Sequence, residues 1–200
     1  MDPGDIIETG TFRGGTTIAI LFALADRAPE KAVWAADSFQ GLPVSVAQDQ
    51  KCDRRNNGGK ACDIRSAGTF MSTRGTFESN LWRFAVNRTR LRVVEGWFSQ
   101  TLPTSGMRRR GLSFIRADGD LYMSTRDALR ALYPLLRPGG VIYIDDYGSF
   151  GGCGKAVDEF RDEHNISSPL HEIWEDNHSF FEAVWWTKAP SEYTEPSLLA

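Results

Sequence analysis

Short apolar runs alternate along this chain with longer segments whose apolar positions repeat at helical spacing. Such alternation is typical of a mostly parallel sheet that carries helices on both faces. We therefore predict an α/β fold with a doubly wound, mostly parallel sheet of seven strands. The runs of strand length are Asp5–Glu8, Ala32–Ala36, Leu91–Glu95, Leu112–Asp118, Val141–Asp145, Leu170–Trp174 and Phe180–Trp186.

The helical spacing predicts helices between these strands. Three of them cover Thr17–Arg27, about Thr73–Val86 and about Gly154–Glu163. A fourth begins after a cap at Ser124 or Thr125 and ends at residues 138–140 (Pro-Gly-Gly). Only a short polar segment separates the last two strands, so we predict that they pair as an antiparallel C-terminal hairpin. A sheet that ends in this way fits the methyltransferase variant of the doubly wound fold better than the dehydrogenase variant.

We expect one domain over residues 1–188, followed by a flexible tail over residues 189–200. The 200 residues of the chain suffice for one continuous core. Residues 40–72 carry no sustained period, although they lie inside the predicted domain. A long irregular stretch in such a place is either a functional lid or a disordered insertion.

Composition and charge argue against several classes of protein. The net charge of −3 disfavours nucleic-acid binding by the whole surface, although the segment from Lys51 to Arg74 is basic. No apolar run is long enough to cross a bilayer and no signal-peptide pattern is present, so we expect a cytoplasmic protein without a membrane partner. Cys52, Cys62 and Cys153 lack the spacing of a zinc site, and a local bridge between the first two stays open.

Acidic residues end several predicted strands: Glu8, Asp37, Glu95, Asp118 and the pair Asp145-Asp146. The carboxyl ends of parallel strands meet at one edge of a sheet, where doubly wound folds bind their ligands. Carboxylates placed side by side repel one another unless cations or hydroxyl donors face them. The row therefore predicts a ligand site at this edge.

A glycine-containing turn, Glu8-Thr9-Gly10-Thr11-Phe12-Arg13-Gly14-Gly15, joins the first strand to the first helix. Glycines let the backbone approach a ligand, and the start of the helix offers free N–H donors. The sequence is neither a dinucleotide-binding fingerprint nor a P-loop, and a tight turn without a ligand is the alternative. Asp37, at the end of the second strand, suits the hydroxyls of a ribose, or else it caps a helix.

Asp118-Gly119-Asp120 and Asp145-Asp146 end two strands that we expect to be neighbours. Adjacent strands lie about 5 Å apart, so these carboxylates can converge on one cation. Three oxygen donors suit Mg²⁺ or a similar hard ion, which a hydride-transfer enzyme does not need. The alternative is that the aspartates only cap a turn and the following helix.

Taken together, these motifs resemble the macrocin O-methyltransferase family of sugar-modifying enzymes. The similarity covers roughly Gly4 to Ile173 in conserved order. The matching segments are residues 7–10 (Ile-Glu-Thr-Gly), 13–15 (Arg-Gly-Gly), 36–43 (Ala-Asp-Ser-Phe-Gln-Gly-Leu-Pro), 95–98 (Glu-Gly-Trp-Phe), 101–103 (Thr-Leu-Pro), 118–122 (Asp-Gly-Asp-Leu-Tyr), 124–125 (Ser-Thr), 137–140 (Arg-Pro-Gly-Gly) and 144–148 (Ile-Asp-Asp-Tyr-Gly).

The resemblance implies an S-adenosylmethionine-dependent, Mg²⁺-dependent methyltransferase that acts on a hydroxyl of a deoxysugar in a macrolide-type natural product. By this resemblance Asp118, Asp145 and Asp146 would hold the metal, and Asp118 would also touch the cofactor and act in catalysis. The methionine portion of the cofactor would contact Glu8, Thr9, Gly10, Arg13, Gly14 and Gly15. Its ribose would lie against Asp37 and Ser38, and its adenine against Gly96 and Trp97.

The chain departs from the family pattern at two points. Relatives carry a substantial segment before the first strand that helps to build the substrate pocket and the oligomer, whereas the first strand here begins at Asp5, so that segment is missing or the sequence is a fragment. The family also implies a histidine base in the lid, yet residues 40–72 contain none. Of His164, His171 and His178, the turn residue His178 is the one that we expect at the active edge, so it is our candidate base.

We therefore expect an enzyme with a small-molecule hydroxyl substrate, and a homo-oligomer is possible. Three alternatives remain. A metal-dependent methyltransferase for catechol-like phenols would use the same aspartates, and an aromatic-lined pocket would favour it. A nucleotide-binding oxidoreductase lacks support from the glycine pattern. A degenerate, non-catalytic S-adenosylmethionine-binding protein would explain the short N-terminus and the missing lid histidine.

Overall fold

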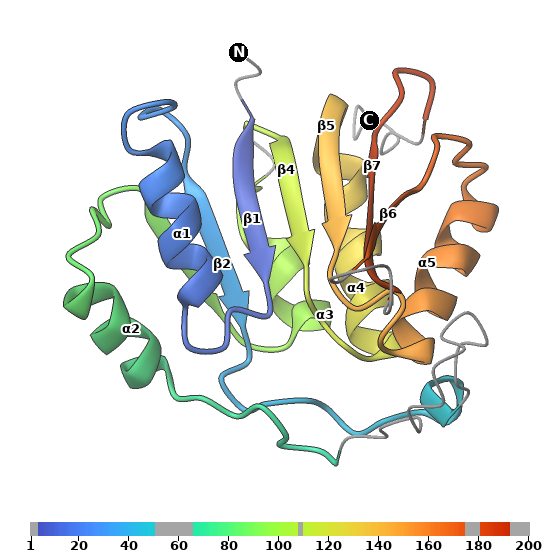
Figure 1. Ribbon diagram of the computed structural model, residues 1–200, viewed down its shortest axis with the longest axis horizontal. Coiled ribbons are helices and arrows are strands. Elements are labelled where there is room, and N and C mark those ends of the chain that lie inside the picture. The colour runs from blue at the N-terminus through green and yellow to red at the C-terminus, as the bar shows by residue number, and fades with distance from the viewer. Residues whose placement is uncertain (1–3, 51–65, 108–109, 175–180, 193–200) are drawn as a thin grey trace.

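The computed structural model describes residues 4–50, 66–107, 110–174 and 181–192 (Figure 1). Within these residues a seven-stranded sheet has the order β3-β2-β1-β4-β5-β7-β6. Its strands are β1 (Asp5–Thr9), β2 (Val33–Asp37), β3 (Leu91–Glu95), β4 (Leu112–Ala117), β5 (Leu136–Ile144), β6 (His171–Trp174) and β7 (Phe181–Thr187).

The pairing of the strands confirms the predicted α/β architecture. β1 to β5 run parallel, and β7 is antiparallel to both β5 and β6, so the C-terminal hairpin is present. All five parallel strands end at the same edge, which we call the carboxyl edge and which lies at the bottom of Figure 1. The strand ends that carry the predicted acids therefore meet there.

Helices form a layer on each face of the sheet. Helices α1 (Gly15–Leu24) and α2 (Arg74–Arg83) cover β1 to β3, where Ile18, Phe77 and Leu81 pack against Val33 and Ala35. The opposite face is the larger core, and it packs against α4 and α5. The remaining helical segments are α3 (Phe98–Thr101), α4 (Tyr122–Leu132), α5 (Gly151–Glu163) and the 3₁₀ turns η1 (Ala47–Gln50), η2 (Leu102–Thr104) and η4 (Tyr133–Leu135).

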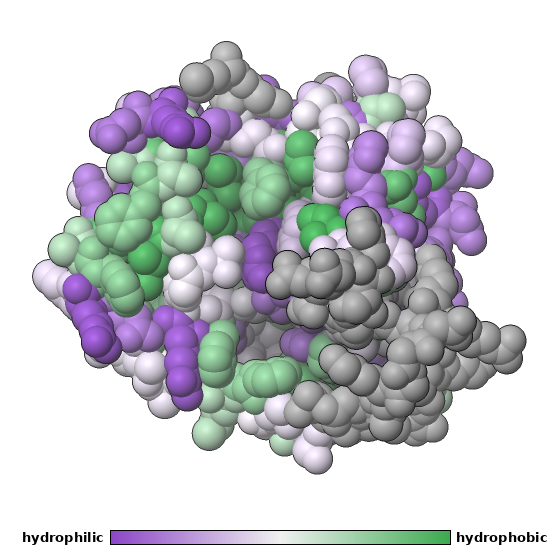
Figure 2. Space-filling model, in the orientation of Figure 1, coloured by the Kyte–Doolittle hydropathy of each residue, from purple (hydrophilic) through white to green (hydrophobic). Residues whose placement is uncertain are grey.

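Helix α1 is apolar on nearly all sides, because its sequence is GTTIAILFAL. Ile18 and Leu21 face the sheet, whereas Phe22 is exposed. Trp82 and Phe84, in and just after α2, are exposed as well. Figure 2 shows apolar side chains gathered over this side of the molecule. Among the helices that the structure describes, none is both long and apolar enough to cross a membrane.

Helix α4 begins and ends earlier than the sequence pattern predicts. It begins at Tyr122 and not after a cap at Ser124 or Thr125. It ends at Leu132 because Pro134 follows in the turn η4 and has no N–H to donate to the preceding turn. Residues 138–140, predicted to end the helix, instead lie inside β5, where the pairing with β4 shifts register.

Part of the predicted flexible tail is fixed to the fold. The carboxylate of Glu192 is buried and accepts hydrogen bonds from the hydroxyl of Tyr133 at 2.6 Å and from the backbone N–H of Ser168 at 3.0 Å. It also accepts from the N–H of Ala189 at 3.0 Å. The chain is therefore held in place up to Glu192, and residues 193–200 lie outside the described part.

The irregular segment predicted over residues 40–72 crosses the carboxyl edge. We call residues 38–50 and 66–73, which contain the described parts of this segment, the strap. In Figure 1 it runs beneath the strand ends, from β2 towards α5 and back towards α2. Its two arms are joined where the N–H of Leu42 donates to Thr69 and the N–H of Gly68 donates to Leu42, both at 2.9 Å. Cys52 and Cys62 lie outside the described residues.

Candidate active site

A cavity of about 660 Å³ opens at the carboxyl edge, between the strand ends and the strap. This volume is in the range of small-molecule binding sites. One side of it is apolar and aromatic, with Phe12, Phe70 and Trp97 among its lining residues. The other side carries the aspartates that follow β4 and β5. The cavity can therefore hold a large ligand with an apolar part and a part that tolerates concentrated negative charge.

The glycine turn after β1 brings the backbone of β1 against the loop after β4. Gly10 has φ 78°, and a Cβ atom there would lie 1.8 Å from the carbonyl oxygen of Asp118. Gly14, the N-cap of α1, has φ 87°, and a Cβ atom there would lie 2.9 Å from the ring of Phe77. Only glycine satisfies both the backbone conformation and the lack of space at these two positions.

Asp37 joins this turn to the strap. Its carboxylate accepts a hydrogen bond from the N–H of Phe12 at 2.8 Å and another from the N–H of Phe39 at 2.7 Å, each on a different oxygen. The oxygen bound by Phe12 also accepts a longer hydrogen bond from the hydroxyl of Thr11 at 3.5 Å, so the lone pair that stays open to a ligand is on the oxygen bound by Phe39. Because Asp37 also lines the cavity, it is suited to accept from a ligand hydroxyl such as one of a ribose.

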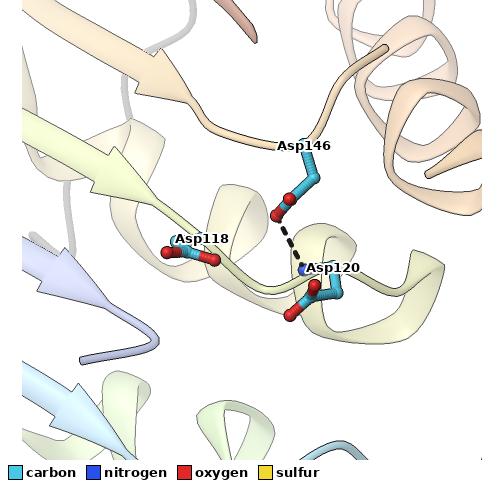
Figure 3. A group of neighbouring side chains, drawn as sticks. All are labelled: Asp118, Asp120 and Asp146. Atoms are coloured by element: carbon cyan, nitrogen blue, oxygen red, sulfur yellow. Dashed lines mark hydrogen bonds between the residues drawn. The ribbon is translucent and has the colours of Figure 1, made fainter. Parts of the chain in front are cut away.

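Three carboxylates converge beyond the ends of β4 and β5. Asp118 and Asp120 follow β4, Asp146 follows β5, and one oxygen of each lies within 4.8 Å of the others. Figure 3 shows the three side chains around a common space, with the N–H of Asp120 donating to the carboxylate of Asp146 at 3.2 Å. Asp120 adopts φ 54°, a conformation that is uncommon for a residue with a side chain.

A guanidinium lies beside this cluster. Arg116, the last but one residue of β4, makes ion pairs with Asp118 at 2.7 Å, Asp145 at 2.9 Å and Glu8 at 3.3 Å. Burial opposes the charge of Arg116, but the carboxylates of Asp118 and Asp145 raise its pKa above the ordinary value. Arg116 therefore stays charged and is shared among three acids.

One shared cation does not offset the cost of placing these acids together. Burial, followed by the charges of neighbouring carboxylates, raises the pKa of Asp118 to about 6 and that of Asp146 well above its ordinary value. Burial also raises the pKa of Glu8 to about 7, although Thr17 and Arg116 oppose this shift. The donor set is made of hard oxygen ligands and lacks positive charge, so its chemistry fits a bound Mg²⁺ ion.

The group of three converging carboxylates contains two members of the predicted metal set. Asp118 and Asp146 lie together as predicted, but the third carboxylate within their reach is that of Asp120. The predicted third ligand, Asp145, lines the same cavity, and one of its oxygens is engaged by Arg116. The sequence predicts that β4 and β5 are neighbours, but it does not show that the side chain of Arg116 in β4 pairs with Asp145 after β5.

The predicted cofactor residues fall into two groups. Those that line the cavity are Gly10, Asp37, Ser38, Trp97 and Asp118. The others shape it without lining it: Glu8, Thr9, Arg13, Gly14, Gly15 and Gly96.

The second group has structural tasks that account for its position. Glu8 and Thr9 are buried in β1, and the carboxylate of Glu8 accepts a hydrogen bond from the hydroxyl of Thr17 in α1. The exposed guanidinium of Arg13 lies 4.9 Å from the centre of the Phe12 ring. Gly96, with φ 132°, provides the turn that directs Trp97 into the cavity wall.

Several lining residues were not predicted from the sequence, notably Phe12, Phe70, Met123 and Asp127. Phe12 stood inside the glycine turn, but its positive φ of 48° is not visible in a sequence. Phe70 reaches the cavity only because the returning arm of the strap packs its ring edge-on against Phe12, with the ring centres 6.3 Å apart. Met123 and Asp127 lie on α4, which begins earlier than expected.

The histidines that the structure describes lie away from the cavity. His164 follows the last turn of α5, and its ring packs against Phe160 with the ring centres 4.5 Å apart. His171 stacks on Trp185 at 4.2 Å in the β6–β7 pair. The candidate base His178 lies outside the described residues.

We expect Glu8 to make the stability of the metal-free protein depend on pH. Because the pKa of Glu8 rises from 4.5 to about 7 on folding, the folded state holds its proton more tightly than the unfolded state does. Stability should therefore fall as pH rises from about 4.5 to about 7. Relative to Glu8→Gln, which cannot ionise, the wild type should lose up to about 3 kcal/mol over this window.

The measurement is urea unfolding of both proteins with a chelator present at several pH values. Glu30→Gln, which replaces an exposed glutamate, serves as the control and should follow the wild type. Parallel stability curves for the wild type and Glu8→Gln would show that Glu8 ionises normally in the folded protein.

Comparisons with known proteins place the chain in a family. Residues 2–188 match the family model described as Macrocin-O-methyltransferase (TylF). The chain is 41% identical over 179 residues to 8-demethyl-8-(2,3-dimethoxy-alpha-L-rhamnosyl)-tetracenomycin-C 4'-O-methyltransferase of Streptomyces olivaceus, which covers 86% of this chain and 63% of that protein. It is 39% identical over 174 residues to mycinamicin III 3''-O-methyltransferase of Micromonospora griseorubida, and the aligned region covers 86% of this chain and 65% of that protein.

A solved structure shows the same relationship in three dimensions. The structure of the O-methyltransferase NovP is 34% identical to this chain and superposes with a TM-score of 0.74, covering 94% of this chain and 72% of that one. The chain spans just under two thirds of the length of the two curated relatives named above. From the family match and these identities, the chain belongs to the macrocin O-methyltransferase family.

Proposed function

We propose that this chain transfers a methyl group from S-adenosylmethionine to a hydroxyl of a sugar in a glycosylated natural product. The observation that carries the proposal is one cavity that joins Gly10 and Asp37 to the cluster of aspartates after β4 and β5. The names of the relatives describe O-methyltransferases, and two of them specify positions on glycosylated compounds. The proposal extends that activity to this chain.

The cofactor half of the cavity suits S-adenosylmethionine, which supplies an electrophilic methyl carbon when it is bound. Gly10 lines this half at the turn that packs against the backbone of Asp118, and Asp37 keeps an open lone pair for a ribose hydroxyl. Trp97, after β3, offers an apolar surface for the adenine ring. Equivalent contacts would hold S-adenosylhomocysteine, the product.

The aspartate half of the cavity suits a divalent cation, which would supply a Lewis acid that lowers the pKa of a neighbouring hydroxyl. We propose that Asp118 and Asp146 bind it. The third ligand is Asp120, which lies within reach, or Asp145, which the sequence predicts and which Arg116 engages through one oxygen. Arg116 would hold Asp118 and Asp145 in place whether or not the ion is bound.

The residues of this chain would contribute chiefly by position. The strap and the aromatic side chains around the cavity exclude water, and the paired strand ends fix the acceptor hydroxyl relative to the methyl donor. Holding two reactants in near-attack geometry accounts for a large part of the rate in such displacements. The acidic lining favours a neutral acceptor such as a sugar over an anionic one.

A second candidate function is methylation of a catechol-like phenol. The aromatic lining of the cavity, which includes Phe12, Phe70 and Trp97, favours it. Assays that offer catechol and a glycosylated macrolide with free sugar hydroxyls, with formation of S-adenosylhomocysteine as the readout, separate the two. Turnover of catechol alone would replace the sugar substrate in the proposal.

Replacement of Asp37 should weaken cofactor binding. S-adenosylhomocysteine should bind the wild type and raise its melting temperature, because a ligand that binds the folded state stabilises it. Asp37→Asn should lower the binding free energy by about 1–3 kcal/mol, the usual loss for charged hydrogen bonds. Isothermal titration calorimetry measures the affinity, and the exposed residue change Asp26→Asn is the control. Absence of binding to the wild type would refute the proposed cofactor.

Removal of the cation should stop turnover while leaving cofactor binding largely intact. A chelator should abolish methyl transfer and added Mg²⁺ should restore it, and Asp118→Asn and Asp146→Asn should each lose Mg²⁺ binding in calorimetry. Asp120→Asn and Asp145→Asn form a matched pair, because the one with the larger loss of Mg²⁺ affinity identifies the third ligand. Full activity in excess chelator would leave the aspartates without a metal role.

The base is proposed to be His178, assisted by the cation. None of the histidines in the described residues lines the cavity, and β6, which precedes His178 in the sequence, runs parallel to β5 and so ends at the carboxyl edge. His178→Ala should lower the rate and remove the acidic limb of the pH–rate profile for an acceptor that the wild type methylates. An unchanged rate and limb would leave cation-assisted ionisation of the hydroxyl as the only route.

A further inference from the structure

The strap forms a large part of the cavity wall. Its residues Ser38, Leu42, Val46 and Phe70 line the cavity, and Figure 1 shows it passing across the carboxyl edge. One end of the strap is fixed by β2, and its arms are joined near Leu42. The shape of the cavity therefore depends on what holds the far end of the strap, where η1 lies against α5.

Asp49 makes the contacts of this far end. One oxygen of its carboxylate accepts a hydrogen bond at 2.7 Å from the N–H of Tyr122, the first residue of α4. The other oxygen accepts at 2.8 Å from the N–H of Val46, within the strap itself. A single side chain thus links the cavity-lining part of the strap to a helix 73 residues away in sequence.

Gly152 in the first turn of α5 provides the space for this carboxylate. A Cβ atom at Gly152 would lie 1.9 Å from the Asp49 oxygen that accepts from Tyr122, and 3.1 Å from the backbone nitrogen of Tyr122. Asp49 therefore lies between the N-terminal turns of α4 and α5. Any larger residue at position 152 would push the carboxylate away.

The two helices lack side-chain caps of their own. The N-cap residues Leu121 of α4 and Phe150 of α5 make no side-chain hydrogen bond to the helix start. The first N–H groups of a helix are unpaired, and the positive end of its dipole favours a carboxylate. Asp49 meets this requirement for α4 through the N–H of Tyr122, and its carboxylate also lies against the first turn of α5. Stabilisation of the start of α4 and placement of the strap therefore come from the same contact.

We propose that Asp49 is a positioning residue that anchors the strap over the cavity, and that Gly152 is required for this anchor. Without the anchor the wall that contains Leu42 and Val46 would open locally, while the sheet beneath stays folded. The effect on ligand binding rests on the proposed function, because the ligand used below is S-adenosylhomocysteine. The effect on the strap itself does not.

The test compares Asp49→Asn and Asp49→Ala with Asp26→Asn, which changes an exposed aspartate just after the C-terminal end of α1. Backbone hydrogen exchange is followed by mass spectrometry in residues 41–50, and in β1 and β4 as a check on folding. Both Asp49 variants should exchange faster over residues 41–50 and bind S-adenosylhomocysteine about tenfold more weakly, because part of the binding free energy would then be needed to order the released strap. Asp26→Asn should change neither quantity.

Gly152→Ala provides a second and independent variant. Alone, it should have the same two effects, because the added methyl group displaces the carboxylate. Combined with Asp49→Ala, it should add little, because the atom with which it clashes is then absent. Additive effects of the two changes would show that Gly152 acts on α5 and not through Asp49.

Two outcomes overturn the proposal. Unchanged exchange over residues 41–50 in Asp49→Ala would mean that the strap does not depend on Asp49. Faster exchange with unchanged affinity for S-adenosylhomocysteine would mean that the anchored strap is not part of the binding site. If the wild type itself does not bind S-adenosylhomocysteine, the proposed function fails, and the exchange measurements still decide whether Asp49 anchors the strap.

Discussion

The mutual repulsion of carboxylates at the carboxyl edge is the constraint that governs this site. The parallel pairing of β1, β4 and β5 brings Glu8, Asp118 and Asp145 together around the one guanidinium of Arg116. Asp146 lies outside these ion pairs and is buried, and its pKa is raised by burial and by the neighbouring acids. Such an arrangement is unfavourable when no cation is bound and becomes favourable when a cation binds there.

The backbone around the site accepts strain for the same purpose. Gly10 touches the backbone of Asp118, and Phe12, Phe39 and Asp120 adopt positive φ at or near the cavity. Residues in such conformations cost free energy and persist when the surrounding structure fixes them. The N–H groups of Phe12 and Phe39 both bind Asp37, so the strained turns hold the carboxylate that faces the cavity.

The sequence allowed prediction of the sheet because its inner strands, such as β1 and β2, are mostly buried and carry short apolar runs. It allowed prediction of Asp37, Asp118 and Asp146 as lining residues because the last residue of a parallel strand has a known place in the fold. The predicted end of α4 is wrong because the helix stops at Leu132, before Pro134, and not at Pro138-Gly139-Gly140. Phe70 and Asp49 were beyond prediction, since their roles depend on how the strap folds back across the strand ends.

Arg116 pairs with two of the carboxylates that are candidates to bind the cation, Asp118 and Asp145, and this bears on which residues can be metal ligands. Arg116 follows the backbone of β4 and reaches Asp118 and Asp145, both of which also line the cavity. A carboxylate that gives one oxygen to a guanidinium keeps the other for a metal ion, so binding to Arg116 does not remove either residue from the ligand set. It does fix their orientation before an ion arrives. Arg116 can therefore preorganise the site while offsetting part of the charge, and the remaining negative charge is what the cation would neutralise.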